Sequence, residues 1–180
     1  MTTPSPILNW VRAARPKTLP AAVVPVAVGT ALGATLSGEW FPGLAALTLL
    51  CCLAFQIATN FFNDAIDFKK GADTPQRLGP VRVTASGLIS PRAVITSGVV
   101  LLLLAVILAL PLVQARGWII IAIGLPSMFL CYGYTGGPFP LAYLGLGELF
   151  VFLFFGLIAV AGSYFVQTNV ISLHKTFRVC

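Results

Sequence analysis

Five long stretches of this chain contain no Asp, Glu, Lys or Arg, and they restrict the fold more than any other feature. These uncharged intervals cover residues 18–38, 40–63, 93–115, 117–147 and 149–173. Each can hold the roughly 20 apolar residues that cross a bilayer core. The mean hydropathy of +0.95 is too high for a soluble domain. We therefore predict an all-α integral membrane protein with about five transmembrane helices, near residues 18–36, 43–63, 93–113, 118–134 and 143–166.

The basic residues are distributed unevenly along the chain, whose net charge is +6. Eight of the eleven lie either before the first expected span or between the second and third: Arg12, Arg15, Lys17, Lys69, Lys70, Arg77, Arg82 and Arg92. The positive-inside rule places both segments in the cytoplasm. Membrane topology thus accounts for the basic residues before the first span, and we expect no nucleic-acid partner. The N-terminus and the 64–92 loop are expected on the cytoplasmic side.

Three of the five acidic residues follow the second expected span within one short segment. At about 100° per residue, Asn60, Asp64 and Asp67 share one helical face. Their hard oxygen atoms are ligands that suit Mg²⁺. Carboxylates at the end of a membrane helix indicate a functional site. This pattern therefore predicts a polar site at the end of the second span.

The loop over residues 64–92 adds basic groups to these acids, namely Lys69, Lys70, Arg77 and Arg82. Arg and Lys side chains bind phosphate oxygens, and Mg²⁺ is often shared between carboxylates and substrate phosphates. One interpretation is a site for a lipid-borne phosphate ester or diphosphate with its tail in the bilayer. The alternative is that Asp64 and Asp67 pair with the loop cations and hold the loop in place. Spacing alone favours neither.

The polar segment also resembles a known motif. Asn60-xxx-Asp64-xx-Asp67, then Lys70-Gly-Ala-Asp73 and Arg77-Leu-Gly-Pro-Val-Arg82, is similar to the first aspartate-rich motif and loop of the UbiA superfamily of intramembrane prenyltransferases. The similarity is greatest to the menaquinone branch, the 1,4-dihydroxy-2-naphthoate polyprenyltransferases. Three other segments also resemble that branch: 15–20, 132–138 and 144–148. The resemblance extends from about residue 8 to about residue 167.

The resemblance implies a helical bundle whose cavity opens to the cytoplasm and the lipid of the cell (inner or plasma) membrane. It implies Mg²⁺ as cofactor, and transfer of a polyprenyl group from polyprenyl diphosphate to 1,4-dihydroxy-2-naphthoate with decarboxylation, giving demethylmenaquinone. Position by position, Asn60, Asp64 and Asp67 match the metal–diphosphate motif and the catalytic centre. Asp73 matches a further metal-motif acid. The residues that match the basic diphosphate-binding loop are Lys70, Arg77 and Arg82.

Two further features are candidates for the site. Tyr132 and Tyr134 could line an aromatic acceptor site, although Tyr is also common at membrane interfaces. Glu148 could face the cavity or serve as a charge at the N-terminus of a helix.

The chain departs from the family in length. The family has about nine spans and a second aspartate-rich motif, whereas no acid follows Glu148 here. We therefore expect residues 1–167 to form the first half of a UbiA-type bundle and residues 168–180 to form an atypical tail. The expectation is a shortened prenyltransferase with little activity alone. The alternatives are a non-catalytic membrane protein that retains half the fold, and a small lipid or ion transporter.

Overall fold

The computed structural model describes residues 5–73 and 82–170, and all regular secondary structure in these ranges is helical. A short amphipathic helix, α1 (Pro6–Ala14), and the 3₁₀ turn η1 (Pro16–Thr18) come first. The long helices α2 (Pro20–Ser37), α3 (Pro42–Lys69) and α4 (Pro91–Arg116) follow, and then α5 (Trp118–Gly133). The described chain ends with α6 (Gly147–Val151), the π-helical segment η2 (Phe152–Ile158) and α7 (Ala159–Thr168). These last three elements form one continuous helix.

Four helices of the described chain are long and apolar enough to cross a membrane: α2, α3, α4 and the continuous helix over Gly147–Thr168. The all-α membrane fold predicted from the uncharged intervals is therefore confirmed. The span expected at 118–134 is the exception, because α5 has only 16 residues. At 1.5 Å per residue it is about 24 Å long, less than a bilayer core of about 30 Å.

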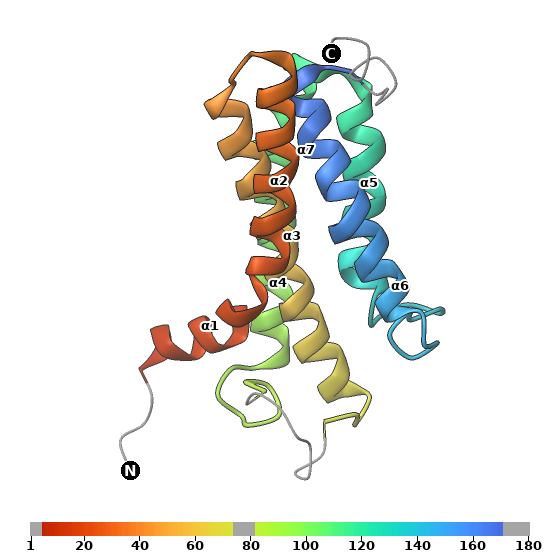
Figure 1. The fold of residues 1–180 in the computed structure, drawn as a ribbon. Helices are drawn as coiled ribbons and strands as arrows, with labels where there is room; N and C mark the ends of the chain where they lie inside the picture. Colours follow the sequence, from red (N-terminus) through yellow and green to blue (C-terminus); the bar gives the residue numbers. More distant parts are fainter. Residues whose placement is uncertain (1–4, 74–81, 171–180) are drawn as a thin grey trace.

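The bundle is built from two closely packed helix pairs, α3 with α4 and α2 with α7 (Figure 1). Two glycines on α2 allow α7 to approach closely. A Cβ atom at Gly29 would lie 2.2 Å from the Val160 carbonyl oxygen, and one at Gly33 would lie 2.6 Å from Cβ of Gln167. Small residues spaced four apart are a common interface in membrane helices. They fix the pairing of the second and last spans.

Helix α3 extends six residues beyond the end expected from the sequence, from residue 63 to Lys69. The expected loop over 64–92 is therefore wrong at its start, because Asp64 and Asp67 both lie on the helix. No Gly or Pro interrupts the segment until Gly71, whose φ of +68° is left-handed. Asp64, Ala65 and Ile66 are buried, so tertiary packing sustains the helix through its polar end.

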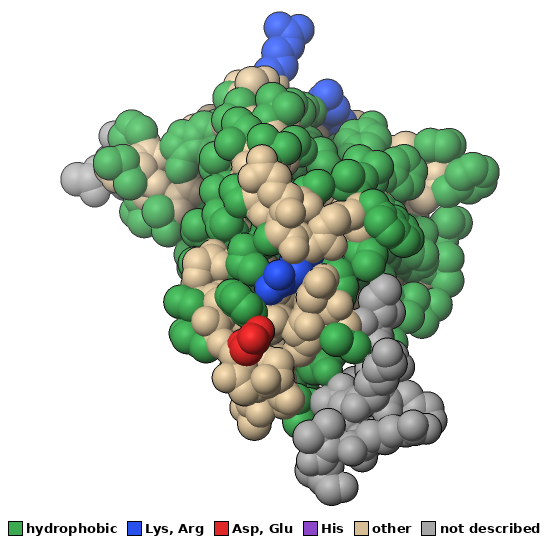
Figure 2. Space-filling model, turned by 90° about the horizontal axis from the view of Figure 1, so that it is seen from above, with side chains coloured by type: hydrophobic (Ala, Val, Ile, Leu, Met, Phe, Trp, Pro, Cys, Tyr) green, Lys and Arg blue, Asp and Glu red, His purple; other side chains and the backbone are tan. Residues whose placement is uncertain are grey.

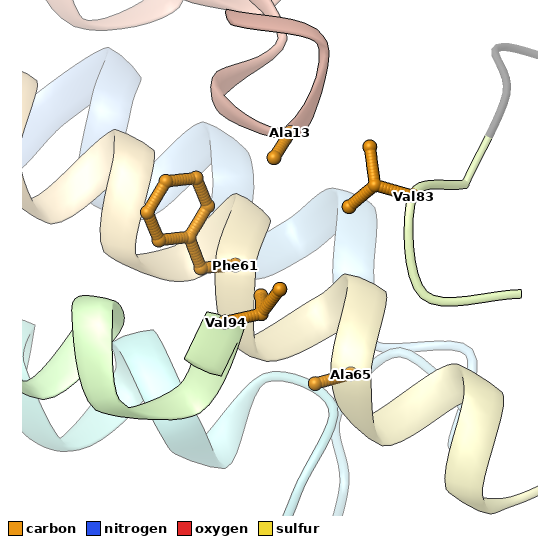
Figure 3. Close-up of a cluster of buried hydrophobic side chains, with 5 residues drawn as sticks. All are labelled: Ala13, Phe61, Ala65, Val83 and Val94. Atoms are coloured by element: carbon orange, nitrogen blue, oxygen red, sulfur yellow. The ribbon is translucent and has the colours of Figure 1, made fainter. Parts of the chain in front are cut away.

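Helix α1 projects sideways from the bundle below α2 and packs against α3 before its last turn (Figure 1). Ser5 caps it, since its hydroxyl accepts the N–H of Leu8 at 3.3 Å. A small apolar cluster joins α1, α3, α4 and the segment before α4 (Figure 3), and it consists of Ala13, Phe61, Ala65, Val83 and Val94. This packing holds the chain beside the acidic end of α3.

The two ends of the bundle differ in polarity. Seen from the end where α2 meets α3 and α4 meets α5, the surface is mainly hydrophobic and shows few charged side chains (Figure 2). The acids Asp64, Asp67 and Asp73 gather at the opposite end, with Arg82 among them. A polar site is thus confined to one end of the bundle.

Candidate functional site

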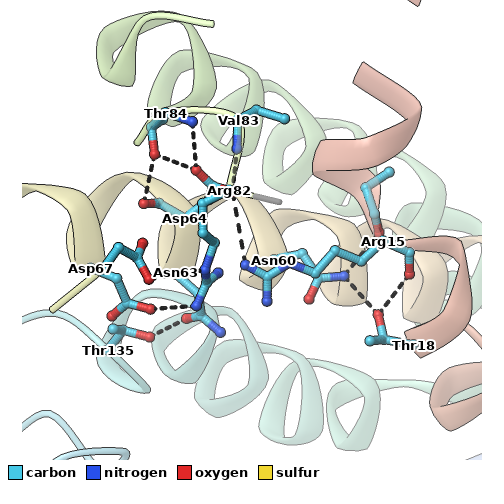
Figure 4. A network of polar contacts seen from close by, with 12 residues as sticks. Arg15, Thr18, Asn60, Asn63, Asp64, Asp67, Arg82, Val83, Thr84 and Thr135 are labelled. Carbon is cyan, nitrogen blue, oxygen red and sulfur yellow. Dashed lines mark hydrogen bonds and ion pairs between the residues drawn. The ribbon is translucent and has the colours of Figure 1, made fainter. Parts of the chain in front are cut away.

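Asp64 is the most completely enclosed acid of the described chain, at 1% exposure. Its carboxylate accepts the backbone N–H groups of Val83 at 3.2 Å and Thr84 at 3.0 Å, and the Thr84 hydroxyl contacts the same group (Figure 4). Arg15 lies 3.9 Å away and adds a positive charge. Both carboxylate oxygens are therefore occupied by protein donors. In this arrangement Asp64 fastens the segment before α4 to α3.

Asp67 lies one helical turn further on and has different partners. Arg82 donates to it at 2.7 Å, and the Tyr143 hydroxyl donates to it at 2.7 Å. The same guanidinium approaches Asp73 at 3.3 Å. Arg82 therefore bridges a carboxylate in the last turn of α3 and one that follows the end of the helix. This cluster of Asp67, Asp73 and Arg82, here called the acid–arginine cluster, carries the charged end of the site.

Asn60 contacts the turn between α1 and α2. Its amide nitrogen donates to the Ala14 carbonyl and to the Thr18 hydroxyl, both at 2.9 Å. Arg15 makes this approach possible, because its left-handed backbone, with φ of +52°, turns the chain sharply between α1 and η1. A non-glycine residue adopts that conformation at an energetic cost. The turn gives Asn60 a fixed orientation on α3.

The connection between α5 and α6 is tied to the end of α3 by a second set of contacts. Lys70 donates to the Thr135 carbonyl at 2.7 Å, and its ammonium lies 4.5 Å from the centre of the Tyr143 ring. The Thr135 hydroxyl donates to the side-chain oxygen of Asn63. Together with the Tyr143–Asp67 bond, these contacts hold the connection over the polar end of the bundle.

A cavity of about 270 Å³ lies between α3, α5 and the α6–η2 helix. Its polar wall comes from one face of α3, with Gln56, Asn60 and Asn63. The facing wall is apolar and aromatic, and it includes Phe150, Phe154 and Phe155. The volume is near the lower end of the range for small-molecule sites. The cavity can hold an apolar ligand with a few polar groups.

The structure separates the residues that the sequence grouped. Asn60 and Tyr134 line the cavity, whereas Asp64 and Asp67 do not. Lys70 and Arg82 make contacts at the end of α3, outside the cavity lining. Arg77 lies outside the described residues. Tyr132 is 49% exposed and packs edge-on against Phe62. Glu148 is exposed in the first turn of α6, away from the lining.

Sequence reasoning missed several residues of the site, namely Thr18, Gln56, Thr84, Thr135 and Tyr143. Gln56 had a detectable signal, because it is a polar residue four positions before Asn60 in an apolar helix. The others lie in turns and connections, where no periodicity shows which side chain faces a helix 20 to 80 residues away.

The donor set can be tested for Mg²⁺. Within the described ranges, no three His, Cys, Asp or Glu side chains are grouped as a metal cage. Backbone N–H groups donate to both oxygens of Asp64, and side chains donate to both oxygens of Asp67. Asp67 is the better candidate ligand, because side-chain partners can move aside for an ion more readily than backbone N–H groups can. With Asp73 it would give the one or two carboxylates that Mg²⁺ commonly uses beside water and substrate phosphates.

These features define an all-helical integral membrane protein with an internal site that joins an apolar cavity to a charged end. The chain belongs to the UbiA prenyltransferase family, whose family model matches residues 22–177. The resemblance of the aspartate-rich segment to this family is therefore confirmed.

Individual relatives agree with this assignment. The chain is 40% identical over 160 residues to a 1,4-dihydroxy-2-naphthoate octaprenyltransferase of Mycobacterium tuberculosis, covering 88% of this chain and 54% of that protein. It is 35% identical over 173 residues to the protein of that name in Haemophilus influenzae, covering 92% and 56%. It is 31% identical over 171 residues to human UbiA prenyltransferase domain-containing protein 1, covering 92% and 49%. The chain thus spans about half the length of these curated relatives.

Proposed function

We propose that this chain carries the diphosphate and acceptor sites of a prenyltransferase of menaquinone biosynthesis. The reaction transfers a polyprenyl group from polyprenyl diphosphate to 1,4-dihydroxy-2-naphthoate. One observation carries the proposal. An apolar cavity with an aromatic wall lies next to the acid–arginine cluster at one end of the bundle. Relatives that share 35–40% of the aligned residues are named for this acceptor, which supports the choice of substrate.

The proposed chemistry begins at the allylic carbon of the prenyl donor. The C–O bond breaks and diphosphate leaves with the electron pair. The ring carbon of the acceptor that carries the carboxylate then attacks the allylic cation. Loss of carbon dioxide returns the electrons of the C–C bond to the ring, and the product is the quinol form of demethylmenaquinone. The carbon skeleton and charges balance without an added oxidant.

The side chains of this chain have distinct tasks in that reaction. Arg82 and Lys70 would bind diphosphate oxygens, as guanidinium and ammonium groups do. Asp67 and Asp73 would hold Mg²⁺, which neutralises charge on a leaving diphosphate when it is bound. The aromatic wall with Phe150 and Phe154 excludes water and presents ring faces that attract a cation. Asn60 orients the polar wall between these two regions.

We place the acid–arginine cluster and α1 on the cytoplasmic side of the cell (inner or plasma) membrane. The basic residues before α2 and between α3 and α4 support this orientation. The water-soluble diphosphate product would then leave on the cytoplasmic side, where α1 lies. The prenyl tail would remain in the lipid.

Binding of a non-hydrolysable polyprenyl thiodiphosphate to the purified chain in lipid nanodiscs tests the proposal. We expect saturable, Mg²⁺-dependent binding. Arg82→Gln should weaken it about tenfold or more, because a charged hydrogen bond to phosphate contributes about 1.5–3 kcal/mol. Arg92→Gln is the matched control, since Arg92 is an exposed cation in the first turn of α4. Absence of saturable binding, or equal effects of the two variants, would contradict the proposal.

A further inference from the structure

The side-chain oxygen of Gln56, on the cavity wall, has no role in the proposed reaction. The side-chain oxygen of Gln56 is buried and accepts no hydrogen bond from the described residues. Gln56 is 8% exposed and lies on the cavity wall, four residues before Asn60 on α3. A buried carbonyl oxygen without a donor costs about 1–3 kcal/mol. Such an atom requires an explanation, and a ligand donor supplies one.

The orientation of the Gln56 amide follows from the hydrogen-bond network around Thr18. The Thr18 hydroxyl has a single proton, and it donates to the Arg15 carbonyl at 2.9 Å. Thr18 can therefore only accept from its other neighbours. Asn60 donates to it at 2.9 Å and Gln56 donates to it at 3.3 Å through their amide nitrogens. The Gln56 oxygen must consequently be on the edge of the amide that faces away from Thr18.

The place of Gln56 in the cavity indicates which part of a ligand it meets. A rise of 1.5 Å per residue puts it about 6 Å deeper than Asn60 and about 16 Å from Asp67 along the α3 axis. It is therefore too deep to contact a diphosphate held by the acid–arginine cluster. A prenyl tail has no hydrogen-bond donor, so a tail against Gln56 would leave the oxygen unpaired. A hydroxyl group on an aromatic ring would satisfy it.

We infer that Gln56 is a specificity-determining residue that accepts a hydrogen bond from a ring hydroxyl of the aromatic acceptor. The ring then lies against the polar wall of α3, and the prenyl chain lies along the aromatic wall of α6 and η2. Thr18 acts as a positioning residue, because it sets the direction of the Gln56 and Asn60 amides together. This inference rests on the proposed function and adds to it a contact that selects the acceptor.

The test compares two ligands on the purified 180-residue chain in nanodiscs, 4-hydroxy-2-naphthoate and its 4-methoxy ether. The ether keeps the ring and the carboxylate, has no proton to donate and is larger by one methyl group. We expect the hydroxy ligand to bind about tenfold more tightly. Equal affinity for the two ligands, or no saturable binding of either, would overturn the inference without any substitution being made.

Two variants then locate the effect. Gln56→Met keeps the length of the side chain and removes the oxygen. This variant should therefore bind the two ligands with about equal affinity. Ser127→Ala removes a hydroxyl from the same cavity that already donates to Ile123 at 2.8 Å, and the preference should persist. A tenfold preference that survives in Gln56→Met would refute the role of Gln56.

Binding of the prenyl thiodiphosphate separates this inference from the proposed function. We expect Gln56→Met to bind it with the wild-type affinity, because Gln56 does not reach the acid–arginine cluster. If the wild-type chain binds the thiodiphosphate but does not distinguish the two naphthoates, only the role of Gln56 fails. If the wild-type chain does not bind the thiodiphosphate, the proposed function fails.

Discussion

Asp64 and Asp67 lie one helical turn apart and yet have different environments. Backbone N–H groups of the segment before α4 donate to the Asp64 carboxylate, whereas the Asp67 carboxylate accepts from the side chains of Arg82 and Tyr143. Side-chain partners can rearrange around a ligand more readily than backbone donors can. Asp64 holds the segment before α4 through backbone donors, and the Asp67–Arg82 ion pair is the contact with a loop cation that the loop-holding alternative expects. Asp67 remains the candidate ligand-binding acid because its partners are side chains.

We therefore expect Asp64→Ala to destabilise the protein by about 3 kcal/mol, since removing one partner of a buried charged network leaves the others unsatisfied. Asp67→Ala should cost less, about 1.5 kcal/mol, because the buried Arg82 keeps Asp73 as a partner. Reversible unfolding in mixed detergent micelles, followed by circular dichroism, gives both values. Equal losses in the two variants would show that the environments do not differ as described.

The sequence predicted the polar face of α3 because its spacing follows helical geometry. It could not predict that the backbone N–H groups of Val83 and Thr84 donate to the Asp64 carboxylate. Their positions depend on the packing of Val83 against Ala13 and Phe61. Residues brought together across turns have no periodic pattern. For the same reason, Tyr143 had no detectable link to Asp67, which is 76 positions earlier.

At the scale of elements, uncharged intervals located the spans but not their ends. Helix α3 extends past the apolar interval because its last turns are buried by neighbouring segments. The last span contains a π-helical segment, η2, which has no signature in its run of Phe and Leu residues. Helix pairing was also invisible from the sequence, although Gly29 and Gly33 are the small residues that permit it.

This pairing gives a prediction for α2. Gly29→Ala places a Cβ against the Val160 carbonyl and should destabilise the bundle by about 1–3 kcal/mol through overpacking. Gly124→Ala is the matched control, because a Cβ there meets nothing within 4 Å. The control should be neutral or slightly stabilising, given the higher helix propensity of Ala. The same micelle unfolding assay measures both, and a neutral Gly29→Ala would refute the close contact of α2 with α7.

For the whole molecule, the separation of a polar end from a hydrophobic end is the feature that both sequence and structure support. In the sequence, eight basic residues lie before α2 or between α3 and α4. The acid–arginine cluster lies at the same end of the bundle as these segments. The sequence resemblance implied a cavity, but its lining residues could not be predicted, because they depend on how α5 and the α6–η2 helix pack against α3. Its position next to the polar end is what the proposed reaction requires.

Labelling of single cysteines tests the proposed orientation. Ala72→Cys and Glu39→Cys place exposed thiols at opposite ends of α3, in a background with Cys180→Ser. In intact cells, a membrane-impermeant maleimide should label Cys only at position 39, and lysis should expose position 72. Labelling of position 72 in intact cells would reverse the orientation.

We propose that this chain supplies the diphosphate and acceptor sites for prenyl transfer. A chimera tests it most directly, in which residues 1–167 replace the matching half of the 1,4-dihydroxy-2-naphthoate octaprenyltransferase of Mycobacterium tuberculosis. The measurement is formation of prenylated product in membranes given Mg²⁺, polyprenyl diphosphate and 1,4-dihydroxy-2-naphthoate. We predict turnover within about tenfold of the parent, and an Asp67→Ala loss of at least about 100-fold, as for other electrostatic stabilisers. A correctly inserted chimera with no turnover, or one that is indifferent to Asp67→Ala, would contradict the account.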